Sequence, residues 1–227
     1  MGEVIEPDIL LRAYASGVFP MADARDADEV YWVDPEKRGI MPLDRFRLSK
    51  SLAKTLRSER FETTVDRAFE QIVALCAAPA DDRPSTWING HIERAVTALH
   101  AAGYAHSIET WLQGELVGGL YGIALGGAFF GESMFSRATD ASKVALAHLV
   151  ARLRVGGFAL LDCQFITPHL ASMGAIEISR ADYMASLSSA LRRAPDFLAF
   201  GASPPRTTSV LGPVSGWRIA QSLVQTS

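Results

Sequence analysis

The chain has 227 residues, of which 48% are hydrophobic and 21% charged, and its formal net charge at pH 7 is −3. A chain of this size can bury a sizeable core, as one domain or as a larger domain with a small companion. The overall charge gives no reason to expect a nucleic-acid partner. Two cysteines, Cys76 and Cys163, are too few for a disulfide scaffold or a Cys-rich zinc site, so we expect reduced thiols.

The N-terminus and the longest uncharged stretch give no sign of export or membrane insertion. The first seven residues lack the basic-then-apolar order of a signal peptide. Residues 116–131 are uncharged, but they fall short of the roughly 18 residues that a spanning helix needs. We therefore expect a cytoplasmic protein that does not cross a membrane.

Residues 1–60 are expected to form a small N-terminal α/β domain. An apolar stripe predicts a helix that begins near Asp8 and ends at Gly17, which suits a left-handed cap. An extended segment follows at Phe19-Pro20, and then a short aromatic strand at 30–33. Residues 34–39 are typical of a turn.

A second helix, from an N-cap at Ser49 to about Arg57, carries a concentration of positive charge. The window 37–60 contains eight basic and two acidic residues, a local charge of +6. Lys50, Lys54 and Arg57 fall on one helical face. Such a face is either ordinary solvated surface or a ridge that tracks phosphates and confines nucleic-acid binding to one place.

Residues 61–194 are expected to form a larger domain in which a mostly antiparallel sheet is flanked by helices, an α+β architecture. Turns at 113–115 and 126–127 separate alternating segments, a pattern typical of hairpins. Strands are expected at 107–112, 116–125, 128–135, 158–165 and 175–178. Helices are expected at 65–78, 89–102, 140–155, 168–173 and 182–193. Residues 195–227, rich in Pro, Ser and Thr, are expected to form a tail without a core of its own.

Several common catalytic motifs are missing from the sequence. It has no GxxxxGK[ST] phosphate loop and no GxGxxG turn. Its five histidines include no HExxH pair, so a metal site is unsupported. Residues 131–135 (GESMF) resemble half of a nucleophile elbow, but Ser133 lacks the second glycine and a strand-to-helix turn. This disfavours a serine hydrolase.

Three polar residues stand in otherwise apolar strands. Asp162 and Gln164 are two residues apart, so in a regular strand they share one face, roughly 6–7 Å apart. Glu132 closes the apolar run 128–131. An ionised carboxylate in a buried strand costs several kcal/mol unless it is paired or hydrated. Either the strands end there and the side chains reach solvent, or the three residues form a site.

A series of dissimilar short segments, in one order, carries a family resemblance. The segments are Ala13-Tyr14, Gly17 to Pro20, Trp32 to Arg38, Thr86 to Ile88, Ala105 to Glu109, Leu116 to Gly122, Phe130 to Ser136, Ala141 to Lys143, Asp162 to Gln164 and His169 to Ala175. From Leu10 to Leu191 the chain resembles the bacterial leucyl/phenylalanyl-tRNA–protein transferases. Met21 departs from the family, which more often has tryptophan there, and nothing in the family explains the chain beyond Arg193.

The resemblance implies an aminoacyltransferase that uses no metal and no separate cofactor. Such enzymes transfer Leu or Phe, and less readily Met, from aminoacyl-tRNA to the α-amine of proteins that begin with Arg or Lys. The product enters the N-end-rule degradation route. The larger domain is implied to be similar to the acyl-CoA N-acyltransferase (GNAT) fold. A monomer is the default expectation.

The same resemblance gives roles to the three polar residues. An α-amine has a pKa of about 8, so aminolysis of the tRNA ester needs positioning and charge stabilisation more than a strong base. Asp162 and Gln164 would hold the attacking amine against the ester carbonyl, and Asp162 would either accept a proton or stabilise the forming ammonium. Glu132 would attract the cationic acceptor residue or bind the amino group of the donor.

Further residues are implied to bind the donor. Trp32 and Trp87 match aromatics near the terminal adenosine, where stacking stabilises a base. The basic face of Lys50, Lys54 and Arg57 is expected to contact the acceptor stem, with an affinity that falls as salt rises. The aminoacyl pocket is expected to include Phe129, Ser133, Met134, Leu146, Leu149 and Leu153. Taken singly, the apolar members of this set are equally compatible with ordinary core.

Two other functions compete with this hypothesis. An acyl-CoA-dependent N-acetyltransferase uses a Q/R-x-x-G-x-G/A turn at a helix start, and residues 136–142 (SRATDAS) lack its glycines. A tRNA-binding module without catalysis needs the basic window, but it does not need Asp162, Gln164 and Glu132 on apolar strands. We therefore expect the aminoacyltransferase.

Overall fold

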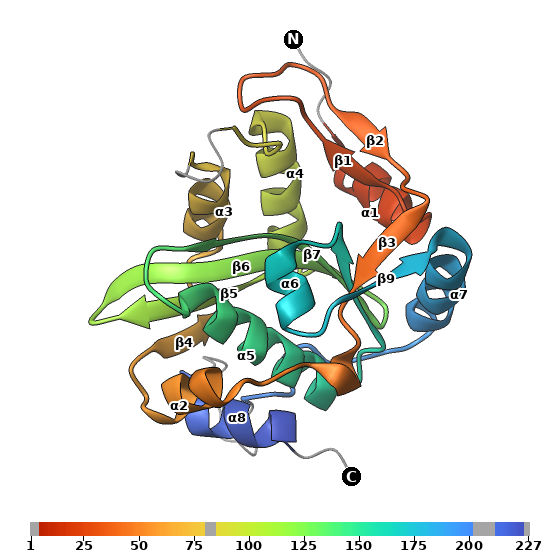
Figure 1. Ribbon diagram of the computed structural model, residues 1–227. Coiled ribbons are helices and arrows are strands. Elements are labelled where there is room, and N and C mark those ends of the chain that lie inside the picture. The colour runs from red at the N-terminus through yellow and green to blue at the C-terminus, as the bar shows by residue number, and fades with distance from the viewer. Residues whose placement is uncertain (1–4, 80–84, 202–211, 225–227) are drawn as a thin grey trace.

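A seven-stranded sheet with the strand order β4-β5-β6-β7-β8-β3-β9 organises the computed structural model, which describes residues 5–79, 85–201 and 212–224 (Figure 1). The strands of this sheet are β3 (Lys37–Ile40), β4 (Glu62–Val65), β5 (Ala105–Leu112), β6 (Glu115–Leu125), β7 (Ala128–Ser136), β8 (Leu160–Gln164) and β9 (Ile176–Ser179). β7 and β8 run parallel, whereas the other neighbouring pairs are antiparallel. β1 (Phe19–Met21) and β2 (Tyr31–Val33) form a separate antiparallel ribbon. The prediction of a mostly antiparallel sheet is confirmed.

Helices cover both faces of the sheet (Figure 1). They are α1 (Pro7–Ala15), α2 (Lys50–Arg57), α3 (Phe69–Ala77), α4 (Gly90–Ala101), α5 (Ala141–Gly156), α6 (Pro168–Ser172), α7 (Arg180–Leu191) and α8 (Gly216–Val224), with a 3₁₀ turn at Leu43–Arg45. One apolar core joins the sheet to α2, α5, α6 and α8, and a second joins it to α1, α3, α4 and α7. None of the helices within the described ranges has the length and apolar character needed to span a membrane.

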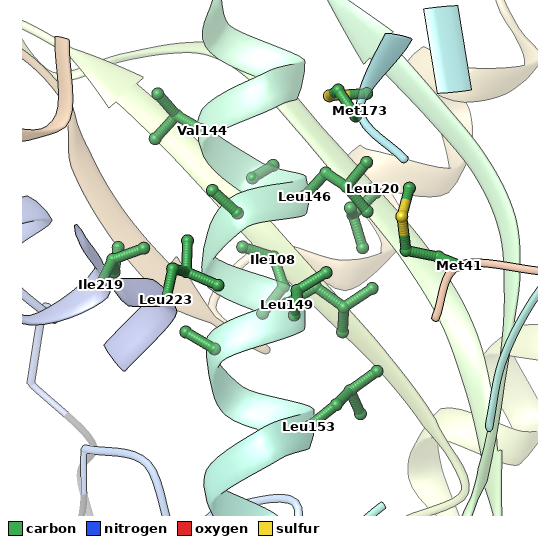
Figure 2. Close-up of a cluster of buried hydrophobic side chains, with 14 of the residues drawn as sticks. Met41, Ile108, Leu120, Val144, Leu146, Leu149, Leu153, Met173, Ile219 and Leu223 are labelled. Carbon is green, nitrogen blue, oxygen red and sulfur yellow. The ribbon is translucent and has the colours of Figure 1, made fainter. Parts of the chain in front are cut away.

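α5 is the central helix of the first face. A glycine in β6 allows its close approach, because a Cβ at Gly118 would lie 2.6 Å from a side chain at the start of α5. Figure 2 shows Leu146, Leu149 and Leu153 projecting from one side of α5, with Ile219 of α8 on the other side. The helix therefore offers one row of leucines to the sheet and packs against α8 with its opposite side.

Residues 37–40 form an interior strand rather than the predicted turn. β3 pairs with β8 on one side and with β9 on the other. Pro35 and Gly39 suggest a turn locally, but Gly39 has a packing role, since a Cβ there would lie 3.1 Å from the Ile166 side chain. The strand depends on partners far along the chain, which local residue preferences do not reveal.

Two further elements differ from expectation. Residues 62–65 form β4, so the following helix begins at Phe69 rather than at Val65. The expected tail contains α8 in its described part, and Phe197 and Phe200 are buried in the core that includes α5. The domain limits at residues 60 and 194 stay a prediction. Contacts cross both limits, because β3 joins the large sheet and α8 joins its core.

Candidate active site

An apolar pocket of about 280 Å³ is lined by residues of β6, β7, β8, α5 and α6 and of the loop between β8 and α6. Its lining residues are Leu120, Tyr121, Gly131, Glu132, Ser133, Met134, Leu146, Leu149, Leu161, Cys163, Gln164, Phe165, Thr167, His169 and Leu170. A larger and more polar cleft of about 640 Å³ adjoins the pocket and shares Met134, Thr167 and His169 with it. A ligand with an apolar end in the pocket can therefore extend into a polar space.

The pocket brings together residues that are distant in sequence. The predicted site residues in its lining are Glu132, Ser133, Met134, Leu146, Leu149 and Gln164. Figure 2 shows Leu146 and Leu149 on the side of α5 that faces Leu120 of β6. Phe129 and Leu153 lie in the apolar core instead, where the ring of Phe129 stacks on Phe197 at a centroid distance of 5.5 Å.

Glu132 and Gln164 form a hydrogen-bonded pair in the pocket lining, which also includes the polar side chains of Ser133, Thr167 and His169. Gln164 Nε2 donates a hydrogen bond of 2.9 Å to Glu132 Oε1, which leaves the amide oxygen of Gln164 as an acceptor. Burial, assisted by the charge of Asp162, raises the pKa of Glu132 to about 8, against the opposing effects of Tyr14, Arg38 and Gln164. The Glu132 side chain is therefore mostly neutral at pH 7.

Asp162 is fully buried and hydrogen-bonded to groups from several elements. Arg38 donates to it from Nε, at 3.0 and 3.1 Å, and from Nη2, at 2.7 Å. The hydroxyl of Tyr183 donates at 2.8 Å, and the backbone N–H of Gln164 donates at 2.8 Å. Arg38 Nη1 also donates to the carbonyl of Gly17, 2.9 Å away, which links the end of α1 to this cluster. Both carboxylate oxygens of Asp162 are therefore engaged by neighbouring protein groups.

The backbone changes direction at Gln164. Its φ of +58° lies in the left-handed region, which is uncommon for a residue other than glycine. The bond from Gln164 N to Asp162 Oδ1 supports this conformation. The two side chains consequently have different partners: Asp162 binds Arg38 and Tyr183, whereas Gln164 binds Glu132. This differs from the shared face expected of a regular strand.

The sequence alone does not identify Arg38 and Tyr183 as site residues. A carboxylate on an apolar strand needs a cationic or donor partner in the core, and this requirement is the indication in the sequence that Asp162 has such a partner. Neither spacing nor composition says which of the 22 basic residues supplies the partner. Arg38 is 1% exposed and its guanidinium stacks between the rings of Phe19 and Tyr183, at 4.4 and 4.6 Å from their centroids.

Trp32 and Trp87 both lie next to β1. Trp32 of β2 stands opposite Pro20 and is 43% exposed. The carbonyl of Trp87 accepts a hydrogen bond from Ala22 N, just after β1. Phe19 of β1 packs edge-on against the pocket residue Phe165, at a centroid distance of 5.7 Å. The ribbon therefore contacts the pocket lining through Phe19, whereas neither Trp32 nor Trp87 is among the residues that line the pocket.

The predicted basic helix is present as α2. The Ser49 hydroxyl accepts a hydrogen bond from the backbone of the first turn, and the helix buries Leu52 and Leu56. The opposite face leaves Lys50, Lys54 and Arg57 exposed, as their spacing predicts.

The family models and the related sequences agree with one another. The family described as leucyl/phenylalanyl-tRNA protein transferase matches residues 40–188, and its N-terminal domain matches residues 4–36. A leucyl/phenylalanyl-tRNA–protein transferase of Rhizorhabdus wittichii is 61% identical over 99% of this chain and 100% of its own length. A second, from Zymomonas mobilis, is 65% identical over 84% of this chain and 71% of its own length.

One solved structure that matches the chain resembles it only distantly. The structure of L-PGS from Bacillus licheniformis aligns with a TM-score of 0.39 at 13% identity, covering 70% of this chain and 53% of the other. This likeness is too weak to assign a fold. The sequence matches are decisive, and the chain belongs to the leucyl/phenylalanyl-tRNA–protein transferase family of aminoacyltransferases.

Proposed function

We propose that the enzyme transfers Leu or Phe, and less readily Met, from aminoacyl-tRNA to the α-amine of proteins that begin with Arg or Lys. The product would enter N-end-rule degradation. The observation that carries this proposal is the Glu132–Gln164 pair in the lining of a mostly apolar pocket. An apolar side chain fits such a pocket, and the polar pair stands where an ester and an amine can be held.

The donor side chain is proposed to occupy the apolar pocket. Met134, Leu146 and Leu149 supply flexible and aliphatic walls, which suit two differently shaped side chains. The adjoining polar cleft allows the ester and the terminal nucleoside to extend outward. Trp32 and Trp87, beside β1, are proposed to contact the terminal adenosine by stacking.

Gln164 is proposed to orient the attacking amine. Its Nε2 group is committed to Glu132, so its amide oxygen is directed by that bond and can accept an N–H of the acceptor. The amine nitrogen then forms a bond with the ester carbonyl carbon, and the bond from that carbon to the ribose oxygen breaks. A proton lost by the amine passes to the leaving ribose oxygen, and the products are a peptide bond and free tRNA. Glu132 is proposed to attract the cationic acceptor residue, because a nearby cation favours its ionised form.

Asp162 is proposed to act as a positioning residue. Its oxygens are already bonded to Arg38, Tyr183 and the backbone of Gln164, which leaves a poor site for a substrate proton. Its effect on the reaction is to hold Gln164 in the left-handed conformation that points its amide at Glu132. The sequence leaves two other roles open for Asp162, as a proton acceptor or as a direct stabiliser of the ammonium. The positioning role replaces both.

The remaining features of the proposal concern the whole enzyme. The exposed cations of α2 are proposed to contact the acceptor stem through backbone charge rather than base identity. We propose a GNAT-like arrangement of the sheet and its helices, a cytoplasmic location and a monomeric state.

Transfer of radiolabelled Phe from Phe-tRNA tests the proposal. One acceptor protein carries an N-terminal Arg, and a matched acceptor carries an N-terminal Ala. We expect label on the Arg protein alone. Label on neither protein, with tRNA still bound in a gel shift, would contradict the proposal and favour a binding module.

A further inference from the structure

α8 is anchored to the end of the basic helix α2, and the two helices lie side by side in Figure 1. The carboxylate of Glu59, just after α2, accepts hydrogen bonds from the backbone N–H groups of Gly216 and Trp217, at 3.1 and 3.0 Å. These N–H groups begin α8, where a helix has no partners of its own for them. The negative charge of Glu59 is therefore directed at the start of α8.

Packing fixes α8 in this position. A Cβ at Gly216 would lie 2.1 Å from the carbonyl oxygen of Leu56, so only glycine permits the observed approach. Ile219 and Leu223 are buried in the core beside α5. At the other end, Arg154 Nη1 donates to the carbonyl of Leu223 at 3.2 Å. These contacts hold the outer face of α8 in a fixed position beside the cations of α2.

That outer face carries an aromatic ring beside a cation. Trp217 is 57% exposed. It lines a hollow of about 240 Å³ together with Arg57, Ala220, Gln221 and Val224. Arg57 is also the last cation of the exposed row on α2. α8 itself contains one basic residue, Arg218, and no acidic residue. The hollow therefore combines a flat apolar surface with positive charge, a combination suited to a nucleotide.

We propose that this hollow is a second contact for the donor tRNA, in which an unpaired base stacks on Trp217 and Arg57 binds an adjacent phosphate. The proposal rests on the proposed function, because it takes the RNA to be the one bound along α2. It adds a site that binds one nucleotide to the row of exposed cations on α2. Its position on α8 lies beyond residues 40–188, the range that the family match covers.

The test compares Trp217→Ala with the unchanged protein, using two donors. One donor is Phe-tRNA, and the other is phenylalanyl-adenosine, which carries the ester on the terminal nucleoside alone. We expect Trp217→Ala to weaken tRNA binding about fivefold or more and to raise KM for Phe-tRNA by a similar factor. We expect its kcat, and its transfer from phenylalanyl-adenosine, to be unchanged. Trp217→Phe retains a ring and should keep most of the tRNA affinity.

A matched control removes an exposed aromatic from the other face of the molecule. Tyr104, after α4, is 40% exposed, and Tyr104→Ala should leave tRNA binding unchanged. Unchanged tRNA affinity in Trp217→Ala overturns the proposal, as does an equal loss with both donors. Loss of self-association on sedimentation, with normal tRNA affinity, overturns it in favour of a second copy of the chain. Failure of the unchanged protein to transfer from either donor contradicts the proposed function instead.

Discussion

In each of two arginine–aspartate pairs, Nε and Nη2 of the arginine donate to the carboxylate, but one pair is buried and the other is exposed. Arg38 and Asp162 are 1% and 0% exposed, whereas Arg180 and Asp34 are 48% and 43% exposed. We expect Arg38→Met to lower the free energy of unfolding by about 3–5 kcal/mol, because it leaves a buried carboxylate without its cation. Arg180→Met should change stability little, since water and salt screen an exposed pair. Urea unfolding of both variants checks this, and equal losses would contradict it.

The protonation of Glu132 gives a second prediction at the scale of a single residue. Its pKa of about 8 in the folded state exceeds the ordinary value of 4.5, so the folded protein binds the proton more tightly than the unfolded chain. Between these values the contribution of Glu132 to stability falls as pH rises. We expect Glu132→Gln to be more stable than the unchanged protein by a few kcal/mol at pH 8 and much less so at pH 5. Thermal unfolding at both pH values measures this difference, and a difference independent of pH would refute it.

At the scale of elements, the leucine row of α5 divides between pocket and core. Leu149 and Leu153 are 1% and 0% exposed, and Leu149 is the one in the pocket lining. Substitution of either by Ala should cost about 2–5 kcal/mol of stability, because both leave a cavity. Leu149→Ala should also lower kcat/KM for Phe-tRNA and Leu-tRNA. Leu153→Ala should retain it at a temperature where both variants are folded. Equal kinetic losses would place both residues in the pocket.

Local signals predicted some elements well and others poorly. The hairpins between residues 105 and 136 follow from alternating residues and glycine turns, which act within a few positions. β3 was predicted as a turn because its pairing with β8 and β9 is not local. α8 is absent from the predicted elements because Pro, Ser and Thr are frequent in the segment before it. The spacing of Ile219, Ala220 and Leu223 is nevertheless helical, and this apolar face was the available signal.

The candidate site was predictable in a similar, partial way. Asp162, Gln164 and Glu132 stand out because polar residues are unexpected on apolar strands. The sequence does not predict that Asp162 and Gln164 bind different partners, since this depends on a left-handed backbone at a non-glycine residue. Phe129 and Leu153 show the same limit, because a buried apolar residue next to a pocket has no sequence feature that separates lining from core.

The whole molecule is weakly acidic but carries a basic window, so RNA binding should depend on where a charge is removed. Lys54 lies on the exposed face of α2, whereas Lys37 is paired with Glu177 at 3.2 Å. We expect Lys54→Gln to reduce the slope of log Kd for tRNA against log salt by roughly 1. Lys37→Gln removes one charge as well, but it should leave the slope nearly unchanged. Filter binding from low to moderate salt distinguishes the two, and equal slopes would contradict the placement of RNA on α2.

The position of β3 between β8 and β9 also has a consequence for the newly made chain. Arg38 leaves the ribosome 124 residues before Asp162, a delay of roughly 6–25 s at ordinary rates of synthesis. Until then the interior strand has neither neighbour, and the partner of its arginine does not yet exist. The sheet is therefore completed late, when β8 and β9, within residues 160–179, pair with the two edges of β3. A nascent chain halted before residue 160 lacks Asp162 and Gln164, so the candidate site cannot form until both residues have been added.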